Sequence, residues 1–233
     1  SGASWYAPVP AGVSVSEPQP YIGDYPGHAR RILNDASIKI DYDLKFATLT
    51  SVTALSRVNS FIHEDLDYTP LDELTAVQPL NSSNLSEELR LVSRGDSAFK
   101  WLGGLYYLRT NQTLTSNVYL GRDYLPLFGL PASLAPLLYS HNSALDRNGA
   151  YASFGQASYR FSPSFELTAG LRYDLDDRHE TDLTSAGSPE YDRRFESLQP
   201  KVSATWYFDP DTMAYATISK GFRSGGFNPT DRI

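Results

Sequence analysis

The clearest pattern in this chain is a one-by-one alternation of apolar and polar residues between Phe165 and Asp176. On an extended backbone, one face carries Phe165, Leu167, Ala169, Leu171 and Tyr173, and the other carries Glu166, Thr168, Gly170, Arg172, Asp174 and Asp176. Because successive side chains of a strand point to opposite sides, this stretch predicts a β-strand with one apolar and one charged face. A soluble sheet covers such an apolar face with a core, whereas a membrane barrel turns it to lipid and turns the polar face to a lumen. The pattern by itself does not separate these two cases.

Similar alternation predicts roughly eight strands in all, a number that also closes small barrels. The predicted strands cover residues 36–44, 46–59, 85–93, 99–118, 151–161, 165–176, 198–208 and 213–221. Glu87 interrupts the apolar face of the third of these strands. The segment 62–84 is too acidic and broken to predict a strand, and Ala132–Tyr139 predicts a short helix inside a proline-rich connection. The sequence therefore predicts an all-β chain built from neighbouring antiparallel hairpins.

The predicted connections alternate strictly between short and long. The short ones lie near Lys45, Gly95, Pro163 and Pro210, and the long ones cover residues 62–84, 119–146 and 179–194. Outer-membrane barrels combine short periplasmic turns with longer extracellular loops. A soluble sandwich has no reason to place every long loop at one end. The alternation thus favours a transmembrane barrel segment, with Pro163 and Pro210 on the periplasmic side and Asp146 and Arg193 outside.

Three stretches resemble the barrel of a TonB-dependent outer-membrane receptor. They read SEELRLVSRGDSAFKWLGGLYYLRT at 86–110, FGQASYRFSPSFELTAGLRYD at 154–174 and LQPKVSATWYFDPDTMAYATISKGFRSGGFN at 198–228. The resemblance covers most of 34–228 and is weak or absent in 1–28 and 117–147. It implies a plugged barrel in the outer membrane of a Gram-negative bacterium, which imports a scarce nutrient such as a ferric siderophore. It also implies a TonB-type energy-coupling protein as partner.

The extent of the chain suggests part of such a barrel. Plugged barrel transporters use about 22 strands, which is many more than this sequence predicts. We therefore expect residues 1–233 to form part of a receptor barrel domain, without the plug, the N-terminal coupling region and the final strand. The segments 1–27 and 223–233 are expected to be loops. A complete small barrel of eight strands is the rival interpretation.

Composition narrows the classes of function. A net charge of −7 argues against nucleic acid as a partner. The absence of cysteine excludes disulfides and thiolate chemistry, and the 16 tyrosines suit the aromatic girdles of a membrane barrel. The alternative function is a soluble, lectin-like β-sandwich that binds its ligand at the loop end.

The sequence predicts neither an enzyme nor a metal or cofactor site. Ser97 and Lys100 fit an S-x-x-K pattern, but that motif should open a helix, and here it follows a turn and opens a strand. No two of the four histidines have the spacing of metal ligands. Asp174, Asp176 and Asp177 are interpreted as a solvated rim of the lumen.

The candidate ligand contacts are aromatic and basic residues of the predicted outer loops: Tyr68, Tyr124, Tyr139 and Arg193. The tyrosines could stack on a small molecule, and the arginine could attract an anionic one such as a metal chelate. For arginines in this region, contact with anionic lipid head groups or with water is the competing hypothesis. The expected partners are therefore outer-membrane lipid and a small-molecule ligand.

Overall fold

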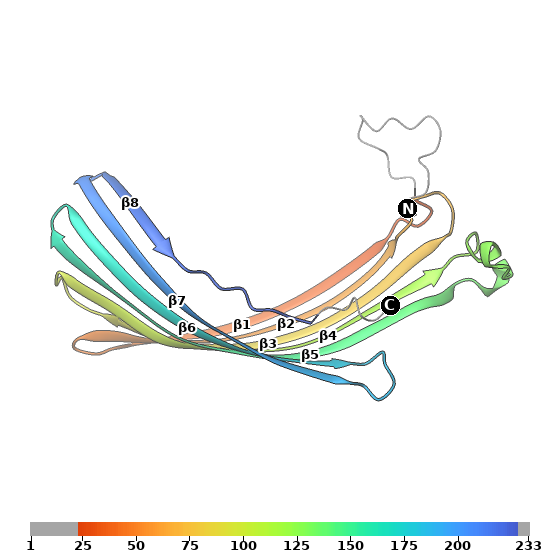
Figure 1. Cartoon of the computed structure of the whole chain (residues 1–233), viewed down its shortest axis with the longest axis horizontal. Coiled ribbons are helices and arrows are strands. Elements are labelled where there is room, and N and C mark those ends of the chain that lie inside the picture. The colour runs from red at the N-terminus through yellow and green to blue at the C-terminus, as the bar shows by residue number, and fades with distance from the viewer. Residues whose placement is uncertain (1–22, 228–233) are drawn as a thin grey trace. The chain divides into compact units, whose positions relative to one another are not determined.

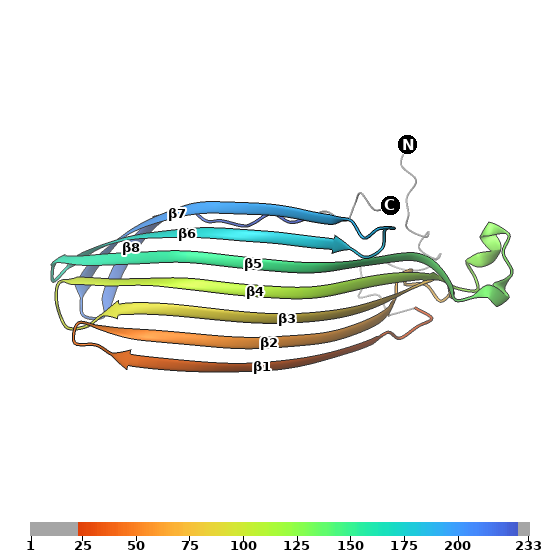
Figure 2. The same ribbon diagram turned by 90° about the horizontal axis from the view of Figure 1, so that it is seen from below.

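A computed structural model describes residues 23–227; residues 1–22 and 228–233, which hold most of the two predicted terminal loops, lie outside the described part. The chain forms an all-β structure whose strands are consecutive hairpins, as the alternation predicts. The strands are β1 (His28–Asp43), β2 (Ala47–Asp65), β3 (Leu74–Ser93), β4 (Phe99–Leu120), β5 (Leu137–Ser162), β6 (Phe165–Asp182), β7 (Glu190–Asp209) and β8 (Thr212–Ser219). They form one eight-stranded antiparallel sheet in chain order, with β1 and β8 at its edges (Figures 1 and 2).

The strands are longer than predicted and the long loops are shorter. The segment 62–84, predicted to be a loop, contributes the end of β2 and the first half of β3. About 9–11 residues suffice for a tilted strand to cross a bilayer, whereas β5 has 26. The strand ends beyond a bilayer need no apolar face, because backbone hydrogen bonds alone can continue the ladder there. That is why alternation in the sequence stops before the strands do.

The alternation of short and long connections is confirmed. The short ones are 44–46, 94–98, 163–164 and 210–211, and the long ones are 66–73, 121–136 and 183–189. In the short turn after β3, Gly95 has a φ of +91°, a conformation that a residue with a side chain rarely adopts. The predicted helix at 132–139 is wrong: Ala132–Leu134 is a single 3-10 turn, a second one covers Leu125–Phe128, and Tyr139 lies in β5.

The chain divides into two compact units, each with its own contacts. Unit 1 comprises Ser1–Ile32, Asn59–Leu80 and Leu114–Ser143, and unit 2 comprises Leu33–Val58, Asn81–Thr113 and Ala144–Ile233. Strands β1–β5 pass through both units, whereas β6, β7 and β8 belong to unit 2. Within residues 23–227, no helix is long and apolar enough to cross a membrane.

The apolar face of the sheet is its more exposed face. On β6, Leu167, Leu171 and Tyr173 are 37%, 49% and 41% exposed, while Thr168 and Arg172, on the opposite face, are half-buried. Among the described residues, the buried apolar side chains are few and mostly small: Ala47, Ala76, Leu120, Leu125 and Ala152. A soluble sandwich would bury this apolar face against a second sheet. The structure therefore contradicts the sandwich and shows the arrangement of a membrane strand.

Glu87 does not break the sheet, although it lies among the apolar residues of β3. Its two carboxylate oxygens accept hydrogen bonds from the hydroxyl groups of Ser51, at 2.7 Å, and Thr53 on the neighbouring strand β2. A carboxylate on an apolar face needs such partners, because an unpaired polar group is costly away from water. The carboxylate that interrupts the apolar pattern of β3 is thus hydrogen-bonded to the neighbouring strand.

Pro200 fixes where β8 ends. Proline has no N–H to donate to a ladder, so it is confined to positions where pairing stops. The carbonyl of Pro200 accepts the N–H of Lys220 at 3.0 Å, and β8 ends one residue earlier, at Ser219. Beyond this point β7 continues without a partner on that side, and residues 220–227 carry no secondary structure.

Candidate functional site

The polar face of β5, β6 and β7 is the candidate functional site. The sheet register places Arg172 of β6 between Phe154 of β5 and Gln199 of β7, so the three side chains share one face. Arg172 donates three hydrogen bonds of 2.7–3.0 Å to Asp174, two residues along the same strand. The side-chain amide of Gln199 also donates to Asp174. The Asp174 carboxylate, which also accepts from Gln199, thus holds the Arg172 guanidinium in a fixed orientation.

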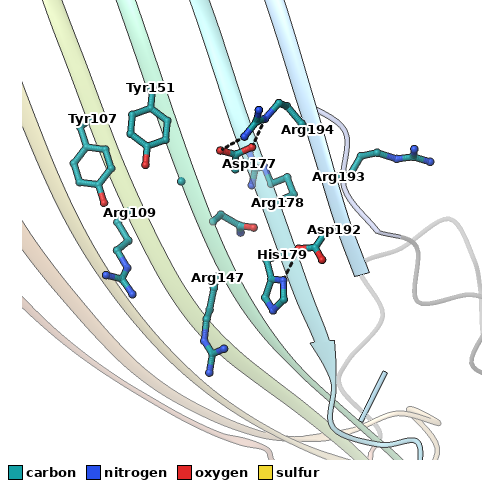
Figure 3. A pocket seen from close by; sticks show the side chains of 12 residues that line it. Tyr107, Arg109, Arg147, Tyr151, Asp177, Arg178, His179, Asp192, Arg193 and Arg194 are labelled. Carbon is teal, nitrogen blue, oxygen red and sulfur yellow. Dashed lines mark hydrogen bonds and ion pairs between the residues drawn. The ribbon is translucent and has the colours of Figure 1, made fainter. Parts of the chain in front are cut away.

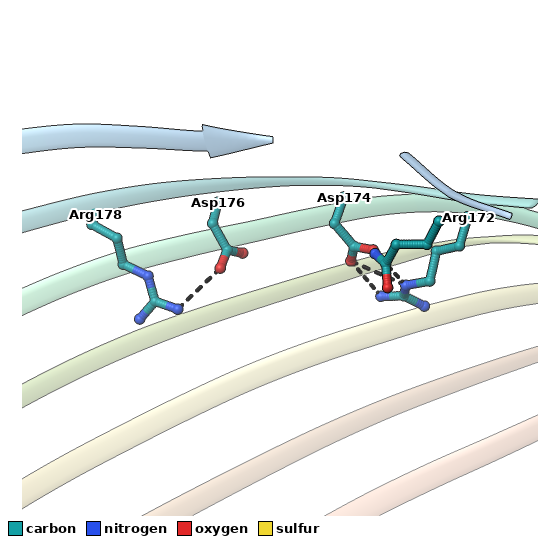
Figure 4. A network of polar contacts seen from close by, with 5 residues as sticks. Arg172, Asp174, Asp176 and Arg178 are labelled. Atoms are coloured by element: carbon teal, nitrogen blue, oxygen red, sulfur yellow. Dashed lines mark hydrogen bonds and ion pairs between the residues drawn. The ribbon is translucent and has the colours of Figure 1, made fainter. Parts of the chain in front are cut away.

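The same pattern repeats one step further along β6. Arg178 donates to Asp176 at 3.0 Å and to the hydroxyl of Ser224 at 2.6 Å. Figure 4 shows Arg172 and Arg178 each turned towards the aspartate two residues away. Asp174 and Asp176 keep 15% and 12% of their side-chain surface exposed. Both carboxylates are thus largely covered by their cation partners instead of by water.

Aromatic rings frame the Arg172 guanidinium. It lies 5.7 Å from the ring centre of Phe154 and 5.9 Å from that of Tyr106, within the range of cation–π attraction. The Phe154 ring in turn covers Gly104 of β4: a Cβ at that position would lie 2.5 Å from the ring atom Cζ. Glycine at 104 is therefore needed for the ring to reach this position.

A second cation lies nearer the short turns. Arg160 donates to Glu166 at 3.3 Å and lies 5.1 Å from the ring centre of Tyr207. Between the two clusters, Gly170 leaves room for a hollow of about 250 Å³, whose polar wall includes Gln156 and Lys201. The polar face therefore offers fixed positive and negative groups, aromatic edges and room for water. Such a surface can guide polar or charged solutes.

The predicted rim of three aspartates is partly wrong. Asp174 and Asp176 share the polar face, but Asp177 points to the opposite side, where Arg194 donates to it at 2.6 Å and 3.2 Å. The alternation of strand side chains in the sequence already separates Asp177 from the other two. Within residues 23–227, no group of three or more metal-ligating side chains comes together.

The four predicted ligand contacts fall in different parts of the chain. Tyr68 lies in the 66–73 connection with 61% of its surface exposed, and Tyr124 precedes the first 3-10 turn, its ring 5.2 Å from that of Phe128. Tyr139 and Arg193 lie in strands β5 and β7 instead of loops. In the sheet register, Arg193 faces Arg178 of β6. The three tyrosines belong to unit 1 and Arg193 belongs to unit 2.

Unit 1 contains a hollow of about 650 Å³ that the sequence did not predict. Its walls include Tyr25, His63, Tyr119 and Arg122, and the rings of Tyr25 and His63 lie 4.2 Å apart. None of the three predicted tyrosines is among its described lining residues. These side chains meet only through the pairing of distant segments, so no local spacing in the sequence identifies them.

The hollow is bordered by two connections that are tightly joined. The N–H of Gly121 donates to the carbonyl of Glu73 at 2.7 Å, and the N–H of Asp72 donates to the Asp123 carboxylate at 2.9 Å. Gly121 approaches Asp72 so closely that a Cβ at 121 would lie 2.1 Å from its carbonyl oxygen. The 66–73 and 121–136 connections are thus held together at one defined point.

Acidic groups crowd around this junction. Burial raises the pKa of the Asp24 carboxyl group, and the nearby carboxylates of Asp65 and Asp72 raise it further. Burial likewise raises the pKa of Glu73, with Asp67 and Asp123 adding to the effect. Both shifts disfavour the charged form of the carboxyl group. In the folded state, charge on Asp24 and Glu73 is therefore opposed by burial and by the neighbouring carboxylates.

Comparison with solved structures shows the same fold at low sequence identity. The ferric yersiniabactin uptake receptor FyuA from Yersinia pestis matches with a TM-score of 0.68 and 17% identity, over 87% of this chain and 30% of that one. The open form of the ferric-catecholate import receptor Fiu from E. coli K12 matches with a TM-score of 0.61 and 14% identity, over 85% of this chain and 36% of that one. The siderophore receptor PiuA from Acinetobacter baumannii matches with a TM-score of 0.56 and 12% identity, over 82% and 32% of the two chains. The chain thus spans about a third of the length of these receptors.

The family is shown by the sequence itself. The sequence model of the family described as TonB dependent receptor-like, β-barrel, matches residues 2–232. The match agrees with the single antiparallel sheet, its alternating connections and its exposed apolar face. The chain therefore belongs to the β-barrel family of TonB-dependent receptors, which lie in the outer membrane of Gram-negative bacteria.

Proposed function

We propose that this chain forms part of the barrel wall of an outer-membrane receptor that takes up a scarce nutrient, and that the nutrient is a ferric siderophore. The observation that carries the proposal is the division of the sheet into two faces. One face exposes apolar side chains that suit hydrocarbon, and the other holds the Arg172 and Arg160 clusters. A lumen that conducts hydrated solutes needs such a polar wall.

The known receptors with the same fold support this choice of nutrient class. FyuA is a ferric yersiniabactin uptake receptor, Fiu is a ferric-catecholate import receptor, and PiuA is a siderophore receptor. Ferric chelates of this kind are often anionic, and they present aromatic or carboxylate groups. Cations framed by aromatic rings, such as Arg172 with Phe154 and Tyr106, suit passage of such molecules.

The rest of the receptor would supply the remaining functions. Eight strands are far fewer than the roughly 22 of a plugged transporter barrel, so we propose that residues 1–233 form one part of the barrel domain. The plug, and the region that contacts a TonB-type energy-coupling protein, would belong to other parts of the polypeptide. Tyr68, Tyr124, Tyr139 and Arg193 remain our proposed ligand contacts, the first three through stacking and Arg193 through charge.

Uptake by cells tests the proposal. Cells that lack their own siderophore receptors would express the full-length protein and receive radiolabelled iron bound to catecholate, citrate or phenolate chelators. We expect accumulation of one class that stops when the proton-motive force is collapsed or the coupling protein is deleted. Uptake of none of the chelates, or uptake that needs no energy, would contradict the proposal.

The proposed contacts are tested in the same assay. Alanine at Tyr68, Tyr124 or Tyr139, and glutamine at Arg193, should raise the half-saturating chelate concentration without lowering the amount of protein in the membrane. Alanine at Tyr42, an exposed tyrosine of β1 next to a short turn, is the matched control. An equal rise in the half-saturating concentration for the Tyr42 variant and for the variants at the proposed contacts would contradict their assignment as ligand contacts.

A further inference from the structure

We propose that the apolar side of β4–β7 carries a binding site for the phosphate head group of an outer-leaflet lipid, built around Arg109 and Arg147. This site rests on the proposed function only in requiring that the apolar face meets lipid. It lies on the face opposite the Arg172 cluster, and it would act as an anchor for the receptor instead of as a part of the transport path.

The strand pattern places the site directly next to the apolar band. On β6, the row of apolar residues passes through Leu171, Tyr173 and Leu175 and then becomes charged at Asp177. The register pairs Leu175 with Tyr151 of β5, and it pairs Asp177 with Gly149. The chemistry of this one face therefore changes from hydrocarbon-like to charged within a single step of the ladder.

Two hollows meet at this boundary. The apolar one has a volume of about 440 Å³, and its walls include Leu89, Leu105, Tyr107, Tyr151, Tyr173 and Leu175. The charged one has a volume of about 600 Å³, and its walls include Arg109, Arg147, Gly149, Asp177, His179 and Arg194. Tyr107 and Tyr151 border both hollows, and their rings lie 5.1 Å apart (Figure 3). Along the strands, the lining side chains thus change from apolar to aromatic and then to cationic.

Gly149 opens the charged hollow. It lies two residues after Arg147 on the same face of β5 and carries no side chain, and the three atoms nearest to a Cβ placed there all belong to Tyr151. A Cβ there would lie 3.4 Å from the ring of Tyr151, and a longer side chain would project into the hollow between the arginines. The hollow, about 600 Å³ in volume, thus has room for a group the size of a phosphate.

The charge on this wall is only partly compensated. Arg194 is paired with Asp177 at 2.6 Å, and His179 is paired with Asp192 at 2.6 Å. No ion pair within the described residues involves Arg109 or Arg147, whose side chains are exposed. The chain as a whole has a net charge of −7, so two uncompensated arginines beside an aromatic pair form a local exception. They suit an anion that approaches from outside.

A lipid fits this arrangement better than a free anion does. Arginine binds phosphate oxygens through paired N–H groups, which accounts for the charged hollow. A free phosphate would have no use for the adjoining apolar hollow, whereas an acyl chain below the head group would fill it. Tyrosines at the boundary match the position that aromatic side chains take between head groups and hydrocarbon.

Lipid binding to the full-length protein tests the site. The protein would be purified in a neutral detergent, and its binding of phosphatidylglycerol and of phosphatidylcholine with the same acyl chains would be measured by native mass spectrometry. We expect the wild type to prefer phosphatidylglycerol. The preference should fall about fivefold for each arginine removed, in R109Q, in R147Q and in the double variant. R109K/R147K should keep most of the preference, because it keeps the charge.

The controls separate this site from general charge and from the proposed transport function. K45Q/K100Q removes two exposed lysines at the short-turn end and should leave the lipid preference unchanged. Nutrient uptake by R109Q/R147Q should persist, so failure of the uptake proposal and failure of this one give different results.

A preference for phosphatidylglycerol that survives in R109Q/R147Q would overturn the site. Displacement of phosphatidylglycerol by millimolar inorganic phosphate would show a free-anion site and would also overturn it. If the double variant does not fold, the single variants R109Q and R147Q decide by the same criterion.

Discussion

Arg172 and Asp174, two residues apart on β6, are joined by three hydrogen bonds of 2.7–3.0 Å, and Asp174 retains only 15% of its side-chain surface exposed. An exposed ion pair contributes little to stability, about 0–1 kcal/mol. A hydrogen bond to a charged group that is partly removed from water contributes about 1.5–3 kcal/mol. We therefore expect this pair on the polar face to contribute to the stability of the sheet.

Arg172→Gln is expected to lower the free energy of unfolding of the full-length protein by about 1.5–3 kcal/mol, because Asp174 loses its main partner. The matched control is Lys39→Gln, which breaks a pair whose side chains are 58% and 45% exposed and should cost less than about 1 kcal/mol. Denaturant titration in lipid vesicles measures both. Similar losses for the two variants would show that the Arg172 cluster is not specially stabilising.

Gly104→Ala is expected to destabilise the protein by about 1–3 kcal/mol through overpacking. Its new Cβ would lie 2.5 Å from Cζ of Phe154 and 2.6 Å from the carbonyl oxygen of Leu89, and the backbone atom cannot move without disturbing the ladder. The neighbouring Gly103→Ala is the control, since its Cβ would meet only the Phe154 carbonyl oxygen, at 3.7 Å. Thermal unfolding of both variants measures the difference, and a larger loss at 103 would refute this packing.

The assignment of lipid to the apolar face predicts opposite tolerances at two nearby positions of β6. Leu171, which is 49% exposed, pairs with Gly155 and Pro200 on the apolar face, whereas Thr168 pairs with Ser158 and Ser203 on the polar face. Leu171→Arg should cost about 2–4 kcal/mol near the bilayer midplane. Thr168→Arg should cost little, because the new cation keeps water and carboxylate neighbours.

Folding of the two full-length variants into lipid vesicles, followed by denaturant titration, measures this difference. Both variants add one arginine to the same strand, so net charge is matched. Equal losses would leave the assignment of the lipid face without support. If Thr168→Arg were the more damaging, the polar face would be the buried one, and the proposed transport function would fail with it.

The acidic junction of unit 1 predicts a stability that rises as the pH falls. The pKa values of Asp24 and Glu73 are raised in the folded protein, so the folded state binds protons more readily than the unfolded state. The contribution of these groups is fully present below their unfolded pKa values, and it is lost as the pH rises through their folded values. The junction should therefore be better protected at about pH 4 than at pH 7.

Hydrogen exchange of residues 66–73 and 121–123, corrected for intrinsic rates, measures this protection. Glu73→Gln should raise protection at pH 7 towards the level that the wild type shows at low pH, since it removes the charge. Asp96→Asn, in the exposed turn between β3 and β4 of unit 2, also removes one negative charge and should have no such effect. Protection that falls on acidification would contradict the prediction.

The sequence by itself determined the strand pattern, the alternation of connection lengths and the two chemically different faces. These features are local, because alternation with period two and turn residues such as Pro163 and Gly95 act within a few positions. The parity of residues along β6 also separates Asp177 from Asp174 and Asp176, although the sequence interpretation grouped all three. Strand ends were not predictable in the same way, because beyond a bilayer the backbone ladder continues without any apolar signal, as in β3 before Leu85.

Only the tertiary structure decided which side chains meet across strands. The hydrogen-bond partners of Glu87 come from β2, and the ring that covers Gly104 comes from β5. A side chain at position 121 is excluded by Asp72, which belongs to a different connection. Such contacts depend on the register between strands, which no spacing within one strand specifies. For the same reason, the sequence does not predict that Arg109 and Arg147 line the same hollow. The sequence specifies two faces for each strand, and the pairing of strands turns those faces into sites.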